Sequence, residues 1–192
     1  MAVDEKSSWN KKYSEGSHSS LEPDPFLVSA YEEFLADRPA GSALDLAGGV
    51  GRHSIWLAQR GWRVKLVDIS EVGIKQAAEN AKRTETASSI TTEVRDLNTK
   101  QDLGREQYDL VLVFFFLQRE LFPALAAAIK PGGFLIYKTY TAEQQHFGST
   151  GPSHPMFLLQ ANELLRAFPS MRVLHYHETI QEKGVAELVA RK

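Results

Sequence analysis

A glycine-rich turn and the aspartates around it are the residues of this chain best suited to bind a ligand. Asp45 lies in a short apolar run and is followed closely by Gly49 and Gly51. These glycines let the backbone turn sharply and approach a ligand with no side chain in between. A helix that begins near Arg52 would direct its free N–H groups to the same place, where they favour an anion. A carboxylate near the end of a buried strand requires a partner, and a ligand ammonium would serve Asp45 as one.

A second acidic residue lies at the end of the following predicted strand. Asp68 comes about twenty positions after the glycines, where an acid in this architecture holds a pair of ribose hydroxyls. A ligand with an ammonium, a carboxylate and a ribose would match Asp45, the helix N-terminus and Asp68 together, and S-adenosylmethionine (SAM) is such a ligand. The structural alternatives stay open at this point: a plain strand-to-helix turn for the glycines, and a solvated strand end or helix cap for Asp68.

The turn does not match two other nucleotide-binding patterns. A P-loop is excluded because no Gly-Lys-Ser/Thr follows the glycines. The dinucleotide fingerprint requires a third glycine three positions after the second, and Ser54 stands there. The chain has no cysteine, and none of its six histidines has the HExxH spacing, so no metal site is predicted.

The elements that must position these residues alternate between strands and helices. Asp24 and Ser70 are expected to cap two of the helices, and Pro131 to Gly133 is expected to form a turn. A polar loop is expected over residues 141–154. Strands are predicted at 43–47, 64–69, 90–94, 108–115, 134–140, 171–176 and 185–189, and helices at 52–60, 70–83, 119–129, 162–168 and from Pro25 to the residues before Pro39.

This order predicts an α/β fold with a doubly wound, mostly parallel seven-stranded sheet (Rossmann-like) and a C-terminal antiparallel hairpin. Ligands on such sheets bind beyond the carboxyl ends of the strands, where the strand order reverses, which points to the turn at 47–51. The length of 192 residues predicts a single domain over 1–192, with residues 1–40 as a helical lid or cap region within it.

Composition narrows the classes of partner. The net charge of −2 shows no basic surplus and disfavours a nucleic-acid partner, so a small-molecule substrate is expected. The longest apolar run, residues 110–117, is too short to span a bilayer, and the N-terminus lacks the apolar stretch of a signal peptide. We therefore expect a cytoplasmic protein without a membrane partner, and the sequence assigns no oligomeric state.

Along nearly its whole length the chain resembles the class I SAM-dependent methyltransferases. Ala47 and Gly48 depart from the commonest form of the first motif, but both are small enough to preserve the turn. The motifs that carry the resemblance are Leu44–Gly51 (LDLAGGVG), Val67–Ser70 (VDIS), Arg95–Leu97 (RDL), Tyr108–Val111 (YDLV) and Pro131–Leu135 (PGGFL).

Within that family the chain is similar to a small bacterial branch that contains tellurite-resistance and thiopurine-type methyltransferases. This similarity does not define the methyl acceptor, because the fold supports many. The stretches that carry it are Trp9–Tyr13 (WNKKY), Gly51–Ser54 (GRHS), Leu117–Pro123 (LQRELFP) and Phe157–Leu159 (FLL).

The resemblance implies SAM as the cofactor and a set of residues that hold it. Asp68 would bind the ribose, Asp96 and Leu97 would lie beside the adenine, and Trp9 and Tyr13 would close over the cofactor as a lid. Packing of a short helix on the core is the alternative for Trp9 and Tyr13, and solvent exposure is the alternative for Arg52 and His53. The predicted cofactor-binding residues are Asp45, Ala47, Gly49, Gly51, Asp68, Ile69, Asp96, Leu97, Phe114, Trp9, Tyr13 and Arg52.

The predicted catalytic residues follow the fourth and fifth strands: Arg119, Tyr140 and His146. Methyl transfer from a sulfonium is an in-line displacement, so the protein mainly aligns the reactants and excludes water, and no metal or nucleophile is required. A general base is needed only if the acceptor must lose a proton. The aromatic run 114–116 is a candidate wall of the methyl path, with strand core as the alternative. A solvated helix position is equally compatible with Arg119, and an ordinary loop position with His146.

Three functions fit these observations. The first is a methyltransferase that acts on a small molecule, the second a methyltransferase that acts on RNA or protein, and the third a SAM-binding module without catalysis. The near-neutral charge and the lack of an appended recognition domain count against the second.

Overall fold

The computed structural model describes residues 5–98, 102–147 and 151–192. Two compact units divide the chain, residues 1–99 and 100–192. Each unit is described by itself below.

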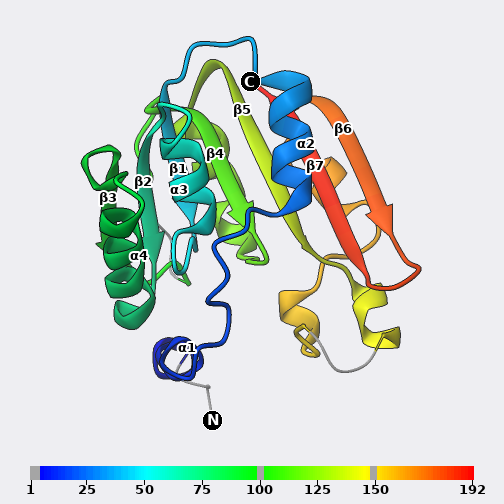
Figure 1. Cartoon of the computed structure of the whole chain (residues 1–192). Coiled ribbons are helices and arrows are strands. Elements are labelled where there is room, and N and C mark those ends of the chain that lie inside the picture. The colour runs from blue at the N-terminus through cyan, green and yellow to red at the C-terminus, as the bar shows by residue number, and fades with distance from the viewer. Residues whose placement is uncertain (1–4, 99–101, 148–150) are drawn as a thin grey trace. The chain divides into compact units, whose positions relative to one another are not determined.

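The first unit contains three parallel strands in the order β3-β2-β1 (Figure 1). Helices α3 and α4 pack against these strands, and Ile74 and Ala77 of α4 contact Leu66 of β2 and Ile90 of β3. Its elements are α1 (Glu5–Ser14), α2 (Pro25–Phe34), β1 (Ser42–Leu46), α3 (Arg52–Ala58), β2 (Arg63–Asp68), α4 (Glu71–Arg83), the 3-10 helix η1 (Ala87–Ser89) and β3 (Ile90–Val94).

The two predicted helix caps are confirmed. The Asp24 side chain accepts a hydrogen bond from the Phe26 N–H at 2.9 Å, at the start of α2. The Ser70 hydroxyl oxygen accepts one from the Gly73 N–H at 3.0 Å, at the start of α4. Each side chain satisfies an N–H group that the first turn of a helix leaves without a partner.

The second unit holds the remaining strands in the order β4-β5-β7-β6, with β4 and β5 parallel and β5, β7 and β6 antiparallel. Phe122 and Phe168 pack on Tyr137 of β5, with ring centroids 6.1 and 6.3 Å away. Its elements are β4 (Tyr108–Phe114), η2 (Arg119–Leu121), α5 (Phe122–Ala128), β5 (Ile129–Tyr140), η3 (Ala142–His146), η4 (Pro155–Phe157), α6 (Glu163–Ala167), β6 (Arg172–Thr179) and β7 (Val185–Arg191).

Strand β5 begins earlier than the sequence predicts. The expected turn at 131–133 was wrong, because these residues belong to the strand, and the helix before it ends at Ala128. Gly132 N–H donates to the Lys192 carbonyl at 2.8 Å, and Lys192 N–H donates to the Gly133 carbonyl at 3.0 Å. The pairing with β4 shifts register between Tyr108 and Leu110, an irregularity that accommodates a proline without an N–H. Residues 148–150 of the predicted loop lie outside the described residues.

The two units together contain seven strands in the order β3-β2-β1-β4-β5-β7-β6. The predicted fold class, a mostly parallel α/β sheet that ends on an antiparallel pair, is confirmed. That residues 1–192 form a single domain stays a prediction. No helix in the described ranges has the length and apolar character needed to cross a membrane.

Candidate cofactor and acceptor sites

The turn after β1 passes through left-handed backbone at three residues. Ala47, Gly49 and Gly51 have φ angles of +55°, +55° and +85°. Glycine adopts such angles freely, whereas alanine does so at a cost of about 1–2 kcal/mol. Ala47 therefore strains the turn.

Asp45 is 1% exposed near the end of β1. Its carboxylate accepts a hydrogen bond from the Ser54 hydroxyl of α3 at 2.7 Å. Burial raises the pKa of Asp45 to about 6, and the Ser54 hydrogen bond and the positive charge of Arg52 offset only part of this rise. An added Cβ at Gly48 would lie 2.8 Å from the carboxylate, so the turn packs directly on it. A carboxylate that is excluded from solvent in this way suits a cationic ligand group.

Asp68 ends β2 and ties two parts of the backbone together. One carboxylate oxygen accepts a hydrogen bond from the Gly49 N–H at 2.9 Å, and the other accepts one from the Ser70 N–H at 2.8 Å. The side chain is 4% exposed, and burial raises its pKa. The alternative of a solvated strand end is therefore wrong. The Ile69 N–H also interacts with this carboxylate and lowers its pKa. A carboxylate offers roughly four acceptor positions, so capacity remains for a ligand hydroxyl.

The residues after β3 lie next to the end of β2. Arg95 N–H donates to the Asp68 carbonyl at 2.9 Å, which fixes the start of this segment. Asp96 lies at the surface, where its Oδ1 accepts a hydrogen bond from the Asn98 N–H at 2.9 Å, and Leu97 is buried. Ile69, another predicted cofactor residue, is half-buried directly after Asp68.

Helix α1 lies across the glycine turn through Tyr13. The Tyr13 ring fills a slot between two glycines: an added Cβ at Gly49 would collide with its hydroxyl, and one at Gly73 would lie 2.9 Å from the ring. The side chain is 6% exposed. Burial and the negative charge of Asp68 raise the pKa of Tyr13, which keeps its hydroxyl protonated beside the turn.

Polar side chains at the start of α4 hold α1 in this position. Asn10 Oδ1 accepts hydrogen bonds from the Ser70 hydroxyl at 2.7 Å and the Val72 N–H at 3.3 Å. The Gln76 amide donates to the Tyr13 carbonyl at 3.2 Å. Trp9 stacks on Tyr13 with ring centroids 5.7 Å apart. Helix α1 of the predicted lid region is thus docked on α4 (Figure 1), and its role as a lid stays a prediction.

Gly73→Ala should loosen α1 even though alanine favours a helix. Alanine is better than glycine inside a helix by about 1 kcal/mol. The added methyl group would lie 2.9 Å from the Tyr13 ring, and overpacking of this kind costs about 1–3 kcal/mol. We expect faster trypsin cleavage after Lys11 and Lys12, which are exposed on α1.

The matched control is the same change in a Tyr13→Ala background. The methyl group then meets no ring, so Tyr13→Ala and the double variant should be cleaved at the same rate. Equal cleavage of Gly73→Ala and the unchanged protein would contradict the packing of Tyr13 in this slot.

Arg52 and His53 begin α3 and differ in role. His53 is buried, and its Nε2 accepts a hydrogen bond from the Asp24 N–H at 3.2 Å, so it holds the start of α2. Arg52 is half-buried, and its charge lowers the pKa of both Asp45 and Tyr13. Arg52 is therefore the one that acts on the groups around the turn.

In the second unit, aromatic side chains meet at the carboxyl ends of β4 and β5. Phe114 is the buried last residue of β4, and Phe115 follows with a φ of +54°. The Phe115 and Tyr140 ring centroids are 5.0 Å apart. A bulky residue with positive φ is a strained exception, so the backbone holds the Phe115 ring in place at an energetic cost.

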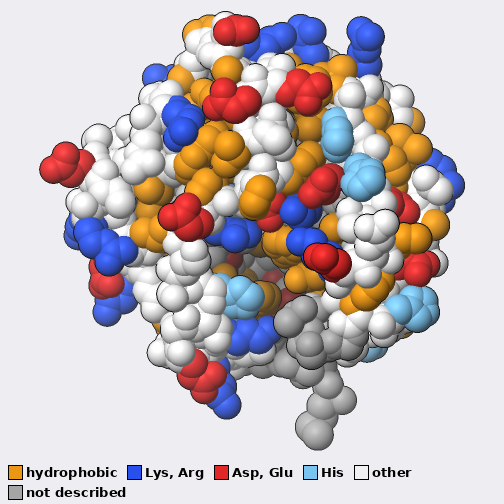
Figure 2. Space-filling view, turned by 45° about the vertical axis from the view of Figure 1, so that its right-hand side comes forward, with side chains coloured by type: hydrophobic (Ala, Val, Ile, Leu, Met, Phe, Trp, Pro, Cys, Tyr) orange, Lys and Arg blue, Asp and Glu red, His pale blue; other side chains and the backbone are white. Residues whose placement is uncertain are grey.

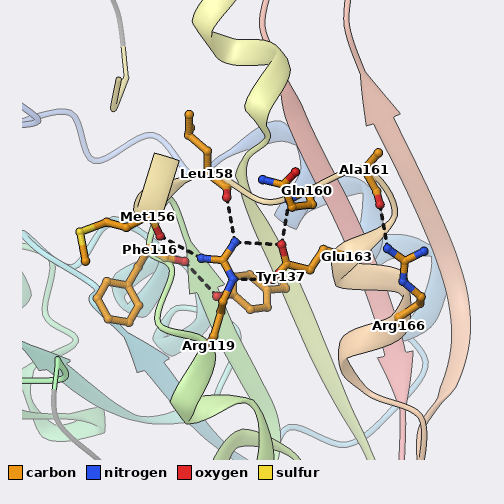
Figure 3. Close-up of polar contacts among 9 residues, drawn as sticks. All are labelled: Phe116, Arg119, Tyr137, Met156, Leu158, Gln160, Ala161, Glu163 and Arg166. Carbon is orange, nitrogen blue, oxygen red and sulfur yellow. Dashed lines mark hydrogen bonds and ion pairs between the residues drawn. The ribbon is translucent and has the colours of Figure 1, made fainter. Parts of the chain in front are cut away.

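The other two predicted catalytic residues lie in different surroundings. The Arg119 guanidinium forms an ion pair with Glu163 at 2.5 Å (Figure 3). His146 is exposed, and its Nδ1 lies 3.1 Å from a Glu143 carboxylate oxygen. A catalytic role for Arg119, Tyr140 and His146 stays a prediction.

Three polar partners were missed by the sequence analysis. Ser54 donates a hydrogen bond to Asp45, Asn10 accepts one from the Ser70 hydroxyl, and Glu163 forms an ion pair with Arg119. These partners are 9, 60 and 44 positions apart in the chain, respectively, so no local spacing signals them. A buried carboxylate requires a hydrogen-bond donor, and this was the one signal in the sequence that such a partner exists. It does not indicate which residue is the donor.

A family model describes the sequence over most of its length. The model of "Tellurite resistance protein TehB" matches residues 28–187. The chain belongs to the TehB family. No curated protein gives a significant match. TehB membership confirms the resemblance to the tellurite-resistance branch of the class I methyltransferases, whose methyl donor is SAM.

Solved structures share the fold of this TehB-family chain. TehB from Haemophilus influenzae has a TM-score of 0.74 and 21% identity, over 95% of this chain and 67% of that chain. A SAM-dependent methyltransferase from Aquifex aeolicus has a TM-score of 0.70 and 19% identity, over 95% and 97% of the two chains. Geranyl diphosphate C-methyltransferase from Streptomyces coelicolor, solved with geranyl-S-thiolodiphosphate and S-adenosyl-L-homocysteine, has a TM-score of 0.64 and 15% identity, over 85% and 75%.

Proposed function

We propose that this TehB-family protein transfers a methyl group from SAM to a small-molecule acceptor. The pair of buried carboxylates beside the glycine turn carries the proposal. Asp45 offers a buried carboxylate to the ammonium of SAM, and Asp68 has acceptor capacity left for a ribose hydroxyl. The turn between them brings bare backbone to a ligand at Gly49 and Gly51.

The remaining predicted cofactor residues complete this arrangement. In the proposal Asp96 and Leu97 border the adenine, since their segment is tied to the end of β2. Tyr13 and Trp9 cover the turn from α1. Arg52 supplies positive charge for the carboxylate of SAM.

Methyl transfer requires the protein mainly to align the methyl donor with the acceptor. Bound SAM supplies a methyl group that is already activated, so the chain's own residues bind, orient and exclude water. No group of histidine, aspartate and glutamate side chains in the described parts of the chain is arranged to hold a metal ion.

A small acceptor is favoured by the distribution of charge. The net charge is −2. Figure 2 shows Lys and Arg side chains interspersed with Asp and Glu on the face in view, whereas a nucleic-acid surface gathers basic groups. The S. coelicolor relative, which is named for a small diphosphate ester, supports the same choice.

Calorimetry tests the cofactor. We expect SAM and its demethylated product to bind with micromolar-range dissociation constants, as enzyme ligands commonly do. NAD should bind poorly, because Ser54 replaces the third glycine of the dinucleotide fingerprint. Tight NAD binding without SAM binding would refute the proposal.

Methyl transfer from labelled SAM tests the acceptor. The probes are tellurite, selenite, thiophenol, total RNA and a protein extract. Label in a small-molecule product supports the proposal. Label confined to RNA or protein would establish the second function instead, and SAM binding without transfer to any probe would point to a binding module.

A further inference from the structure

We propose that Arg119 is a positioning residue of the acceptor site. Its guanidinium holds residues 156–160 at the carboxyl ends of β4 and β5 and leaves contact with the acceptor to other groups. This inference rests on the proposed methyl transfer, because it assigns a part of the second unit to the acceptor.

The contacts of Arg119 lead to this segment and to Glu163, which follows it in the chain (Figure 3). Nε and one terminal nitrogen donate to the two carboxylate oxygens of Glu163, at 2.5 and 2.8 Å. The terminal nitrogens also donate to the backbone carbonyls of Met156 and Leu158, at 3.0 and 2.8 Å. The planar fork of a guanidinium suits such a bidentate pair, and these bonds use four of its five N–H donors.

Glu163 closes the segment into a loop. The oxygen that pairs with Arg119 also accepts a hydrogen bond from the Gln160 N–H at 2.7 Å. The Arg119 hydrogen bonds hold the pKa of Glu163 below its usual value, so the pair stays ionised near neutral pH. Arg119 and Glu163 therefore fix the backbone from Met156 to Gln160 at three separate points.

The same segment is bonded to the end of β5. Leu159 N–H donates to the Tyr140 carbonyl at 2.9 Å, and Ala142 N–H donates to the Leu159 carbonyl at 2.8 Å. Leu158 and Leu159 are fully buried. The exit of β4 is held as well, since the Tyr137 hydroxyl donates to the Phe116 carbonyl at 3.0 Å.

The position of this clamp, by which we mean Arg119 and Glu163 with the segment they hold, relates it to the acceptor. Ligands of open α/β sheets bind beyond the carboxyl ends of the strands, which is where Phe115 and Tyr140 meet. A segment bonded to Tyr140 on one side and to Arg119 on the other fixes the border of that region. Four of the five Arg119 N–H donors are taken up by Glu163 and by the backbone of this segment, so we assign Arg119 to holding the segment and the contact with the acceptor to other groups.

Arg119→Ala and the matched control Arg166→Ala test the clamp. Arg166 belongs to the same region but makes a single bond there, from its terminal nitrogen to the Ala161 carbonyl at 3.0 Å (Figure 3). We expect faster hydrogen exchange of the amides of residues 156–163 in Arg119→Ala and a clearly smaller change in Arg166→Ala, which loses one bond instead of four. Arg119→Lys keeps the charge but not the fork, so its exchange should be intermediate. It also serves if the alanine variant fails to fold.

Kinetics separate positioning from catalysis. With tellurite as the probe, or thiophenol if tellurite is not methylated, the KM of Arg119→Ala for the acceptor should rise about fivefold while kcat stays within about twofold. The dissociation constant for SAM should not change. A fall in kcat with an unchanged KM would make Arg119 a participant in the reaction and overturn the proposal.

Hydrogen exchange and SAM binding test the clamp and the proposed function separately. Unchanged exchange of residues 156–163 in Arg119→Ala overturns the clamp at any level of activity. Absence of SAM binding in the unchanged protein overturns the proposed function and the acceptor role of the clamp. The hydrogen-exchange data would still show whether Arg119 holds the segment.

Discussion

Asp68→Ala should weaken SAM binding by about 10- to 100-fold, because the loss of one hydrogen bond to a charged acceptor costs roughly 1.5–3 kcal/mol. The variant should also be less stable. The N–H groups of Gly49 and Ser70 lose the carboxylate that joins them. A loss of about 2 kcal/mol lowers the melting temperature of a chain of this size by about 4–8 °C. Calorimetric titration and thermal melting measure the two effects.

Two further variants make the Asp68 result interpretable. Asp37→Ala removes an exposed aspartate just after α2 and should leave both affinity and melting temperature unchanged. Asp68→Asn keeps the shape but faces one backbone N–H with an amide N–H, so it should retain only part of the stability. Unchanged SAM affinity in a folded Asp68→Ala protein would count against the cofactor site.

SAM affinity should rise about tenfold between about pH 5 and pH 7.5, because binding of the ammonium requires an ionised Asp45. Burial raises the pKa of this carboxyl to about 6, so it carries a proton at the lower pH and loses it at the higher. A titration at several pH values measures the change. In Asp45→Asn, which has no proton to lose, most of the pH dependence should disappear.

The ligand-free protein should respond to pH with the opposite sign. The folded pKa of Asp45, about 6, lies above its value in the unfolded chain, about 3.9. Its contribution is therefore fully present below about pH 4 and is lost as the pH rises through 6, by about 3 kcal/mol in total. Thermal melts of the unchanged protein should thus fall relative to Asp45→Asn over this range. If both proteins kept the same profile, another group would be responsible.

The periodic parts of the fold were predictable from local sequence. Asp24-Pro25 and Ser70 favour the start of a helix before an apolar periodic run, because the cap is a contact within four residues. The buried strand β4 was predictable from its continuous apolar residues. The start of β5 was not, since Pro-Gly-Gly is typical of turns and only pairing with β4 and with Lys192 draws it into the sheet.

The candidate site was predictable in its residue types and not in its partners. Asp45 and Asp68 can be singled out in the sequence because a charged side chain at the end of a buried strand requires a polar partner. What surrounds them depends on distant contacts: the Asp45 partner comes from α3, and the cover over the turn comes from α1. The same holds for Arg119, whose four donor bonds are decided by a segment about forty residues further on.

The docked α1 has a kinetic consequence. Tyr13 fills the slot beside the glycine turn, so we expect a nucleoside bound at this turn to exchange with solvent after the helix has separated from α4. The contacts that oppose separation are a few hydrogen bonds and a ring stack, which is typical of segments that open in microseconds to milliseconds. If SAM binds at this turn as proposed, we expect the lifetime of the docked helix to set the residence time of the spent cofactor, so that residues 5–14 limit turnover without touching the reacting atoms.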